Sequence, residues 1–237
     1  MKTQDLKEAD KLVWLYTEKL GKISAVARGA KRSKSKFLAS TLPFCFGEYI
    51  VYKGRSLYNI SEGAIINSFQ ELMGDLDHLT YASYLCELID IAVQEEESNR
   101  ELFKTFVSCF YLMSKKVVDL EVMARAFEVK LLEATGYGLN LDYCCHCKSK
   151  INTSNYISFQ YGGGVCSECE KVNGMYVSYA TYNILKFLSK LSIDKIYRVS
   201  MKKEEKDELY RILSVIIAQN YTRKPKSLEI YAFLKKE

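Results

Sequence analysis

The sequence predicts an α+β protein of several domains, with a small N-terminal β-domain, a helical bundle and a four-cysteine module inserted into the bundle. Three observations predict this class. Strand-like runs with glycine turns occupy residues 11–62, and apolar residues recur at helical spacing from about residue 68. Five of the eight cysteines fall between residues 144 and 169. The predicted segments are 1–68 for the β-domain, 69–141 for the helical domain, 142–175 for the cysteine module and 176–237 for helices that complete the helical domain.

The β-domain is predicted to contain four strands. Residues 12–17 and 23–28 are rich in β-branched and aromatic side chains and flank a glycine turn, which is typical of a hairpin. Residues 44–52 and 57–60 flank a second glycine turn and predict two further strands.

The rest of the chain predicts helices. Apolar residues at three- and four-residue spacing and a chain with only two prolines favour a helical body. Gly136 is predicted to end the third helix, because glycine accepts the left-handed conformation that follows many helices. The predicted helices are 79–92, 99–116, 119–135, 178–190, 203–221 and a tail helix from about residue 226.

Nothing in the sequence predicts a membrane or a secreted protein. No run approaches the roughly 18 apolar residues of a membrane span, and the first ten residues, MKTQDLKEAD, are too charged for a signal peptide. We therefore expect a cytoplasmic protein, in which clustered cysteines remain thiols or metal ligands rather than disulfides.

The formal net charge of +5 is unevenly distributed. Residues 1–40 carry ten Lys and Arg against four Asp and Glu, and residues 134–237 carry sixteen against ten. Residues 71–133 carry six against thirteen. Basic segments suit a polyanion through phosphate neutralisation, and the simpler interpretation of each segment is a solvated surface.

The cysteine module has the spacing of a tetrahedral metal site. Cys144-x2-Cys147 is followed after eighteen residues by Cys166-x2-Cys169. Each pair can present two thiolates to one ion, and the gap lies within the range of zinc sites. A site with four cysteine ligands is closed, so the predicted zinc ion is structural rather than catalytic.

Two alternatives concern the same cysteines. A rubredoxin-like iron site has compatible spacing, whereas a redox Cys-x-x-Cys lacks its usual strand–helix context. Cys145 and His146 lie between the first two ligands. We expect them to be spectators, although either could compete for the metal.

A basic loop follows the second predicted strand. Small residues separate its cations, and aromatic candidates for base stacking lie on the neighbouring strands. A basic groove with stacking aromatics is how OB-type barrels hold single-stranded nucleic acid. The alternative, favoured for Trp14 and Tyr49, is that the aromatics fill the barrel core. The cations are Arg28, Lys31, Arg32, Lys34 and Lys36, and the remaining aromatics are Tyr16, Tyr52 and Tyr58.

A catalytic set is not evident in the sequence. His78 and His146 have no obvious nucleophile or acid partner, and residues 162–164 lack the lysine of a phosphate-binding loop. The acidic run 95–97 is interpreted as an exposed turn between helices. We therefore predict that the protein is not an enzyme, a nuclease included.

Several short motifs occur in an informative order. KISAVARGAK at 22–31 lies in the β-domain, RAFEVKLL at 125–132 and Gly136-Tyr137 lie in the helical segment, and KPKS at 224–227 follows the two cysteine pairs. Over nearly its full length the chain resembles the RecO family of bacterial DNA repair and recombination mediator proteins.

The resemblance implies a fold, partners and site residues. It implies an N-terminal OB domain, a helical bundle, and a zinc module with Cys144, Cys147, Cys166 and Cys169 as ligands. It implies binding of single- and double-stranded DNA, strand annealing and, with RecR, loading of RecA onto DNA coated by single-stranded-DNA-binding protein, at the bacterial nucleoid. The family's basic OB surface corresponds to the Arg28–Lys36 loop, and its pocket for the acidic tail of the single-strand-binding protein corresponds to the segment of Arg125, Phe127 and Lys130.

The chain departs from the family at its N-terminus. Family members open with a strand before the Glu8-Ala9-Asp10-Lys11 segment, and here only seven residues precede it. An OB barrel has five strands, so either the first strand is missing or shortened, or the N-terminal residues take its role. With an incomplete barrel, an alternative function is a zinc-ribbon scaffold that acts through protein contacts, its acidic segment suiting a basic partner.

Overall fold

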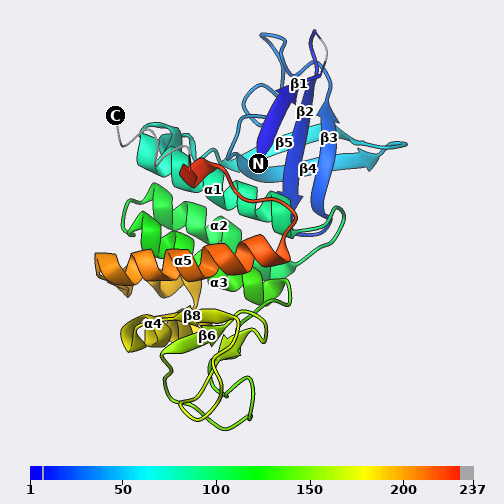
Figure 1. The fold of residues 1–237 in the computed structure, drawn as a ribbon. Helices are drawn as coiled ribbons and strands as arrows, with labels where there is room; N and C mark the ends of the chain where they lie inside the picture. Colours follow the sequence, from blue (N-terminus) through cyan, green and yellow to red (C-terminus); the bar gives the residue numbers. More distant parts are fainter. Residues whose placement is uncertain (7, 230–237) are drawn as a thin grey trace. The chain divides into compact units, whose positions relative to one another are not determined.

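The computed structural model describes residues 1–6 and 8–229 of the chain (Figure 1). The described residues divide into two compact units. Unit 1 contains Met1–Lys116 and the described residues from Pro225 on, and unit 2 is Val117–Lys224. Each unit combines helices with a small sheet, so the predicted α+β class is confirmed.

Unit 1 begins with a sheet of five strands within the described residues. The order is β1-β2-β3-β5-β4, in which β3 and β5 are parallel and the other neighbours are antiparallel. A five-stranded, partly open sheet fits the predicted OB type. The strands are β1 (Lys2–Asp5), β2 (Lys11–Thr17), β3 (Gly21–Ala27), β4 (Phe46–Lys53) and β5 (Tyr58–Asn67).

Strand β1 corrects the predicted count of four. It pairs with β2 in the register Thr3↔Val13, so the N-terminal residues take the role of the first strand and that strand is not missing. Three of its four residues are exposed and none is buried, because it lies at the edge of the sheet. A short polar edge strand has no apolar alternation by which the sequence could reveal it.

The core of the sheet comes from alternate residues of β2 and β3. Val13 and Leu15 of β2 pack with Ile23 and Ala25 of β3, and Ile60 of β5 joins them. This inward-facing set fixes the register, since a slip of one residue would expose it to water.

Five of the six predicted helices are present within the described residues. Asp75, Asn99, Asp119 and Ser178 cap four of them by accepting backbone N–H groups of the first turn. Among the described residues, no helix has both the length and the apolar character needed to cross a membrane. The helices are η1 (Gln70–Met73), α1 (Leu76–Ala92), α2 (Arg100–Ser114), α3 (Leu120–Ala134), α4 (Tyr179–Lys190), η2 (Ile193–Arg198) and α5 (Lys203–Asn220).

The ends of two helices can be compared with their predictions. Gly136 has φ 84° just after α3, which confirms the predicted helix end. Residues 227–229 are helical, in agreement with the start of the predicted tail helix. The remainder of that helix, from residue 230, lies outside the described residues.

Unit 2 joins a helical layer to the cysteine module. Helix α3 packs against α4 and α5. The module contains a small sheet of the order β7-β6-β8, made of β6 (Tyr156–Ser158), β7 (Gly163–Gly164) and β8 (Gly174–Tyr176). It is fastened to α4 at Leu141 and Asp142. The Tyr182 hydroxyl donates to the Leu141 carbonyl at 2.9 Å, and Asp142 forms ion pairs with Lys186 and Lys190.

Candidate functional site

The first Cys-x-x-Cys forms a tight turn that places both of its sulfur atoms on the same side. The N–H of Lys148 donates to the carbonyl of Cys144 at 3.0 Å, and the N–H of Cys144 donates to the carbonyl of Ser149 at 2.8 Å. Lys148 has φ 62°, a left-handed conformation that closes the turn. The local backbone is therefore that of a metal knuckle, as its spacing predicts.

The second pair completes a four-sulfur cluster. The sulfur atoms of Cys144, Cys147, Cys166 and Cys169 all lie within 4.8 Å of one another. The Cys147 and Cys166 sulfurs are 3.7 Å apart, and four sulfurs each about 2.3 Å from one zinc ion would be about 3.8 Å apart. The donor set and its spacing thus fit a tetrahedral ion, and the four cysteines could hold a metal.

The thiols of this cluster differ in acidity. Burial opposes ionisation of Cys144, but N–H groups of Cys166, Cys147 and His146 point at its sulfur and lower its pKa to about 6. Hydrogen bonds with the Cys166 and Cys147 sulfurs raise the pKa of Cys169 to about 12. A bound ion would replace the remaining thiol protons.

Two neighbours in the knuckle point elsewhere. The Cys145 thiol is buried and faces the carbonyl of Gly163, 3.9 Å away. The His146 ring lies edge-on to Tyr161 at 4.5 Å, and its Nε2 has no hydrogen-bond partner among the described residues. Neither side chain belongs to the four-sulfur group.

Glycines allow the second pair to approach the first. A Cβ on Gly163 would lie 2.4 Å from the carbonyl oxygen of Asn140, and one on Gly164 would lie 2.1 Å from the Tyr182 hydroxyl. The carbonyl of Gly164 accepts the N–H of Cys145 at 2.9 Å. Strand β7 is therefore pressed against both α4 and the first knuckle, and Cys166 follows two residues after its end.

The basic loop lies between β3 and β4 in unit 1 and is anchored at its base. The N–H of Gly29 donates to the Asp10 carboxylate at 2.8 Å, and the N–H of Lys31 donates to the Ala9 carbonyl at 3.0 Å. The Lys31 ammonium pairs with Asp5 of β1 at 2.7 Å. This cation is therefore already partly neutralised by the strand that the sequence did not reveal.

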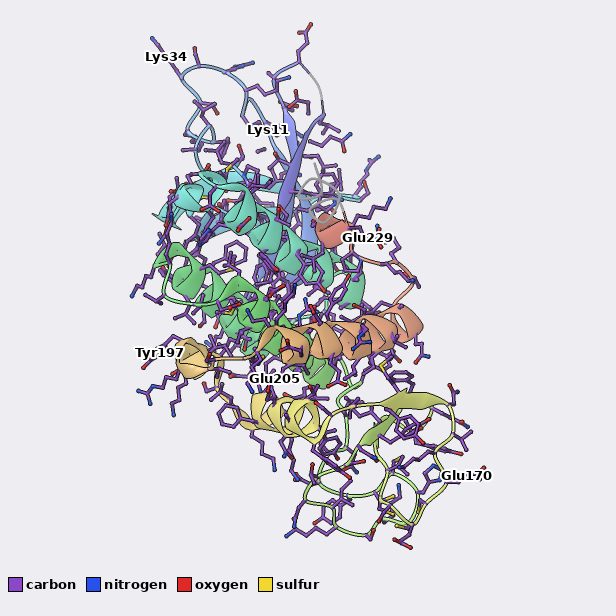
Figure 2. The ribbon with its side chains drawn as sticks, turned by 60° about the vertical axis from the view of Figure 1, so that its left-hand side comes forward. Lys11, Lys34, Glu170, Tyr197, Glu205 and Glu229 are labelled. Carbon is purple, nitrogen blue, oxygen red and sulfur yellow. The ribbon has the colours of Figure 1, made fainter. Side chains whose placement is uncertain are left out.

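The other cations of the loop are exposed. Arg28, Arg32, Lys34 and Lys36 all face solvent, and Lys34 projects from the outer end of the loop (Figure 2). The Lys36 ammonium lies 5.2 Å from the centre of the Phe37 ring, and Phe37 is buried. Four cations are thus offered to a ligand from one loop.

The aromatic candidates have different environments. Tyr16 is buried against Phe103 and Phe106, and Tyr49 packs on the sheet core with its hydroxyl donating to the Ser40 carbonyl at 2.7 Å. Trp14 and Tyr58 are half-buried, whereas Tyr52 is 63% exposed. Tyr49 therefore packs on the core, as the favoured alternative predicted, and Tyr16 is buried as well. For Trp14 the core interpretation is wrong, because its ring is only half-buried, lies outside the core cluster of the sheet and has the Lys2 ammonium 4.6 Å from its centre.

Two family models match almost the whole of this chain. The model described as recombination protein O N terminal matches residues 1–69, and the one described as recombination protein O C terminal matches residues 73–229. The chain belongs to the RecO family.

Individual relatives carry the same name. A protein called DNA repair protein RecO in Clostridium novyi (strain NT) is 56% identical over 236 residues, covering 100% of this chain and 92% of the relative. The protein of that name in Clostridium acetobutylicum is 54% identical, and the match covers 100% of this chain and 96% of the relative. The one in Alkaliphilus metalliredigens is 31% identical, and the match covers 91% of this chain and 89% of the relative. The predicted resemblance is confirmed, and a DNA repair or recombination role is supported.

The predicted tail-binding residues lie in α3 of this RecO chain. Phe127 is fully buried, and Arg125 is buried with its guanidinium 3.0 Å from Glu128 and 4.9 Å from the centre of the Tyr210 ring. Lys130 is more accessible and pairs with Glu133 at 3.1 Å. The helical periodicity located the segment, but it could not distinguish a side chain that meets a partner from one that fills the core.

Sequence reasoning missed one interaction on the sheet. Glu96 pairs with Lys53 at 2.7 Å and accepts a hydrogen bond from the Tyr58 hydroxyl at 2.9 Å. The run 95–97 is indeed an exposed turn between helices, as predicted, but it also contacts the sheet. The sequence feature that pointed to this contact was Gly21, because a residue without a side chain leaves room for the backbone of another segment.

Proposed function

We propose that this RecO-family protein is a recombination mediator that acts by binding and not by catalysis. It binds single- and double-stranded DNA, anneals complementary strands and, with RecR, helps RecA load onto DNA coated by single-stranded-DNA-binding protein. The proposal includes association with nucleoid DNA. The observation that carries it is the exposed basic loop on an OB-type sheet in a chain of this family.

The loop supplies phosphate contacts. Arg28, Arg32, Lys34 and Lys36 are exposed on one short segment, and its base is fixed by Asp10 and Ala9. Each cation that neutralises a phosphate releases counterions, so affinity for single strands should fall steeply with salt. Tyr52, exposed on β4, offers a ring for stacking of a base.

The metal in this proposal is one structural zinc ion. Cys144, Cys147, Cys166 and Cys169 would hold it, and a closed four-thiolate site supplies folding free energy rather than a reactive water. Iron would use the same ligands. Metal analysis of the purified protein distinguishes the two ions.

The acidic tail of the single-strand-binding protein is proposed to bind unit 2 near Lys130. Lys130 contacts Glu133 and the carbonyl of Ser189, and both of these residues line a small apolar pocket between α3, α4 and α5. A cation beside a small pocket suits a peptide that carries acidic groups. Arg125 and Phe127 would then support this region from within the core.

The loop assignment is tested by charge reversal. A Lys31→Glu, Arg32→Glu, Lys34→Glu variant should bind a fluorescein-labelled oligo-dT strand more than about tenfold more weakly at low salt, because three cations of the loop become anions that repel phosphate. Fluorescence anisotropy over a series of salt concentrations measures it.

The matched control reverses three exposed cations of unit 2, Lys195→Glu, Arg198→Glu and Lys203→Glu, and should lose far less. Equal losses of DNA affinity in both variants would show that the loop is not part of the DNA interface. A wild-type chain that binds no DNA at low salt but captures RecR or the single-strand-binding protein would instead support the scaffold function.

A further inference from the structure

The connection between α1 and α2 is built onto the sheet of unit 1. The N–H of Glu96 donates to the carbonyl of Lys22 in β3 at 2.9 Å, and Glu95 pairs with Lys22 as a parallel bridge. A Cβ on Gly21 would lie 2.1 Å from the carbonyl oxygen of Glu97. The close approach therefore requires glycine at the start of β3, and the acidic turn has a fixed place on the sheet.

The backbone of Glu96 is held in an unusual conformation. Its φ of 61° is in the left-handed region, which costs a non-glycine residue about 1 kcal/mol or more and persists only where the surroundings hold the residue there. The bond to Lys22 supplies that restraint. The turn thus presents the Glu96 side chain to β4 and β5 in one orientation.

The Glu96 carboxylate is bound through both oxygens. Oε2 accepts from the Lys53 ammonium at 2.7 Å, and Oε1 accepts from the Tyr58 hydroxyl at 2.9 Å. The Lys53 ammonium also lies 5.7 Å from the centre of the Tyr58 ring. An ammonium and a hydroxyl that converge on two oxygens of one anion can bind a phosphate in the same way.

This arrangement lies where an OB-type sheet meets nucleic acid. Lys53 and Tyr58 flank the turn between β4 and β5, and the loop at this position contacts oligonucleotides in OB folds. Tyr52 and Arg55, which are close to them in the sequence, are exposed. The only anion on this site in the described residues is Glu96 of the same chain.

We propose that Lys53 and Tyr58 form a binding site for a DNA backbone phosphate, and that Glu96 occupies this site as an internal competitor until DNA displaces it. The inference rests on the proposed DNA-binding function of unit 1. It adds a second contact region, separate from the Arg28–Lys36 loop, and a means of limiting affinity for nucleic acid.

The competition is weak enough to be reversible. The side chains of Lys53 and Glu96 are 64% and 47% exposed, and exposed ion pairs are weak and screened by salt. Removing the Glu96 charge should therefore raise affinity for single-stranded DNA by about two- to fivefold at low salt.

The test compares four full-length proteins for binding of labelled oligo-dT. They are wild type, Glu96→Gln, the charge-matched control Glu101→Gln, and Glu96→Gln combined with Lys53→Gln. Glu101 lies in α2, is highly exposed and pairs with Lys104 of its own helix. We expect a gain for Glu96→Gln, little change for Glu101→Gln, and a return to wild-type affinity or below in the double variant.

Each other outcome overturns the inference. Equal gains for Glu96→Gln and Glu101→Gln would reveal a general charge effect, and a gain that survives Lys53→Gln would exclude Lys53 as the contact. If the wild type binds DNA but Glu96→Gln changes nothing, the inference fails while the proposed function stands. If the wild type binds no DNA, the proposed function fails and the inference fails with it.

Discussion

At the scale of single residues, Cys145 and Cys166 are thiols of one module with different neighbours. Cys166 lies 3.7 Å from the Cys147 sulfur and donates its own N–H to the Cys144 sulfur at 3.4 Å. Cys145 faces the Gly163 carbonyl. The Cys166 thiol therefore belongs to the four-sulfur cluster, whereas the Cys145 thiol packs against β7.

This difference gives a matched pair of variants. Cys166→Ser should lose most of the bound metal and lower the melting temperature of unit 2, because a hydroxyl is a poor ligand and the site carries folding free energy. Cys145→Ser should keep about one metal ion per chain. Elemental analysis with thermal unfolding measures both; loss of metal in Cys145→Ser alone would reverse the ligand assignment.

Spacing predicted the cysteine cluster because a metal imposes a strict local geometry. Two knuckles separated by a suitable gap can converge in few ways, so four residues were enough. The same reasoning could not predict that Asp5 pairs with Lys31 or that Glu96 pairs with Lys53. Those pairs join residues 26 and 43 positions apart in the chain, and no short motif encodes them.

At the scale of elements, α3 is the central helix of unit 2 and contains a buried ion pair. Arg125 and Glu128, 3% and 0% exposed, are one turn apart and 3.0 Å from each other. Their neighbour Phe127 is fully buried, as are Met123 and Leu131. A charge placed in such surroundings depends on its partner, because water cannot solvate it.

Removing one member of this pair should therefore be costly. Glu128→Ala should lower the free energy of unfolding by about 3–5 kcal/mol, because the Arg125 charge remains buried without its carboxylate. The combined Arg125→Met, Glu128→Leu variant should lose less, since both charges leave together. Urea unfolding followed by circular dichroism measures both losses.

The control for this experiment lies on the same helix. Glu121 is half-exposed in the first turn of α3 and pairs with Lys206 at 3.3 Å. Glu121→Ala should cost about 1 kcal/mol or less, as exposed pairs do. A loss for Glu128→Ala no greater than that of Glu121→Ala would contradict a buried pair.

Element types followed from periodicity more reliably than element lengths did. The helices repeat their apolar face over three or more turns, so their pattern is long enough to recognise. Strand β5 runs to Asn67, seven residues beyond its predicted end at Ile60, and its final part is largely exposed. That part is held by pairing with β4 and not by burial, so the sequence carries little signal of it.

At the scale of the whole molecule, the charge of a segment is a poor guide to the charge of a surface. Residues 71–133 are strongly acidic, but several of their carboxylates have cationic partners. Glu96 is held by Lys53, Asp119 by Lys206 and Glu128 by Arg125. The pairing of these acids weakens the argument that this segment awaits a basic partner protein, on which the scaffold alternative relied.

The metal site and the basic loop belong to different units. The four cysteines belong to unit 2, and the loop together with Lys53, Tyr58 and Glu96 belongs to unit 1. A structural ion stabilises the part of the chain that holds its ligands, and phosphate contacts depend on cations of the other unit. Stability and DNA affinity should thus respond differently when the metal is removed.

Metal removal from the wild-type protein tests this separation. After treatment with a mercurial thiol reagent and a chelator, we expect release of about one zinc ion and a lower thermal midpoint for unit 2. Affinity for oligo-dT at low salt should change by less than about twofold, because each of its proposed contacts lies in unit 1. Reduction and added zinc should restore the midpoint. A collapse of DNA affinity that parallels zinc release would show that the cysteine module takes part in the nucleic-acid interface, and the division of labour proposed for the two units would then be wrong.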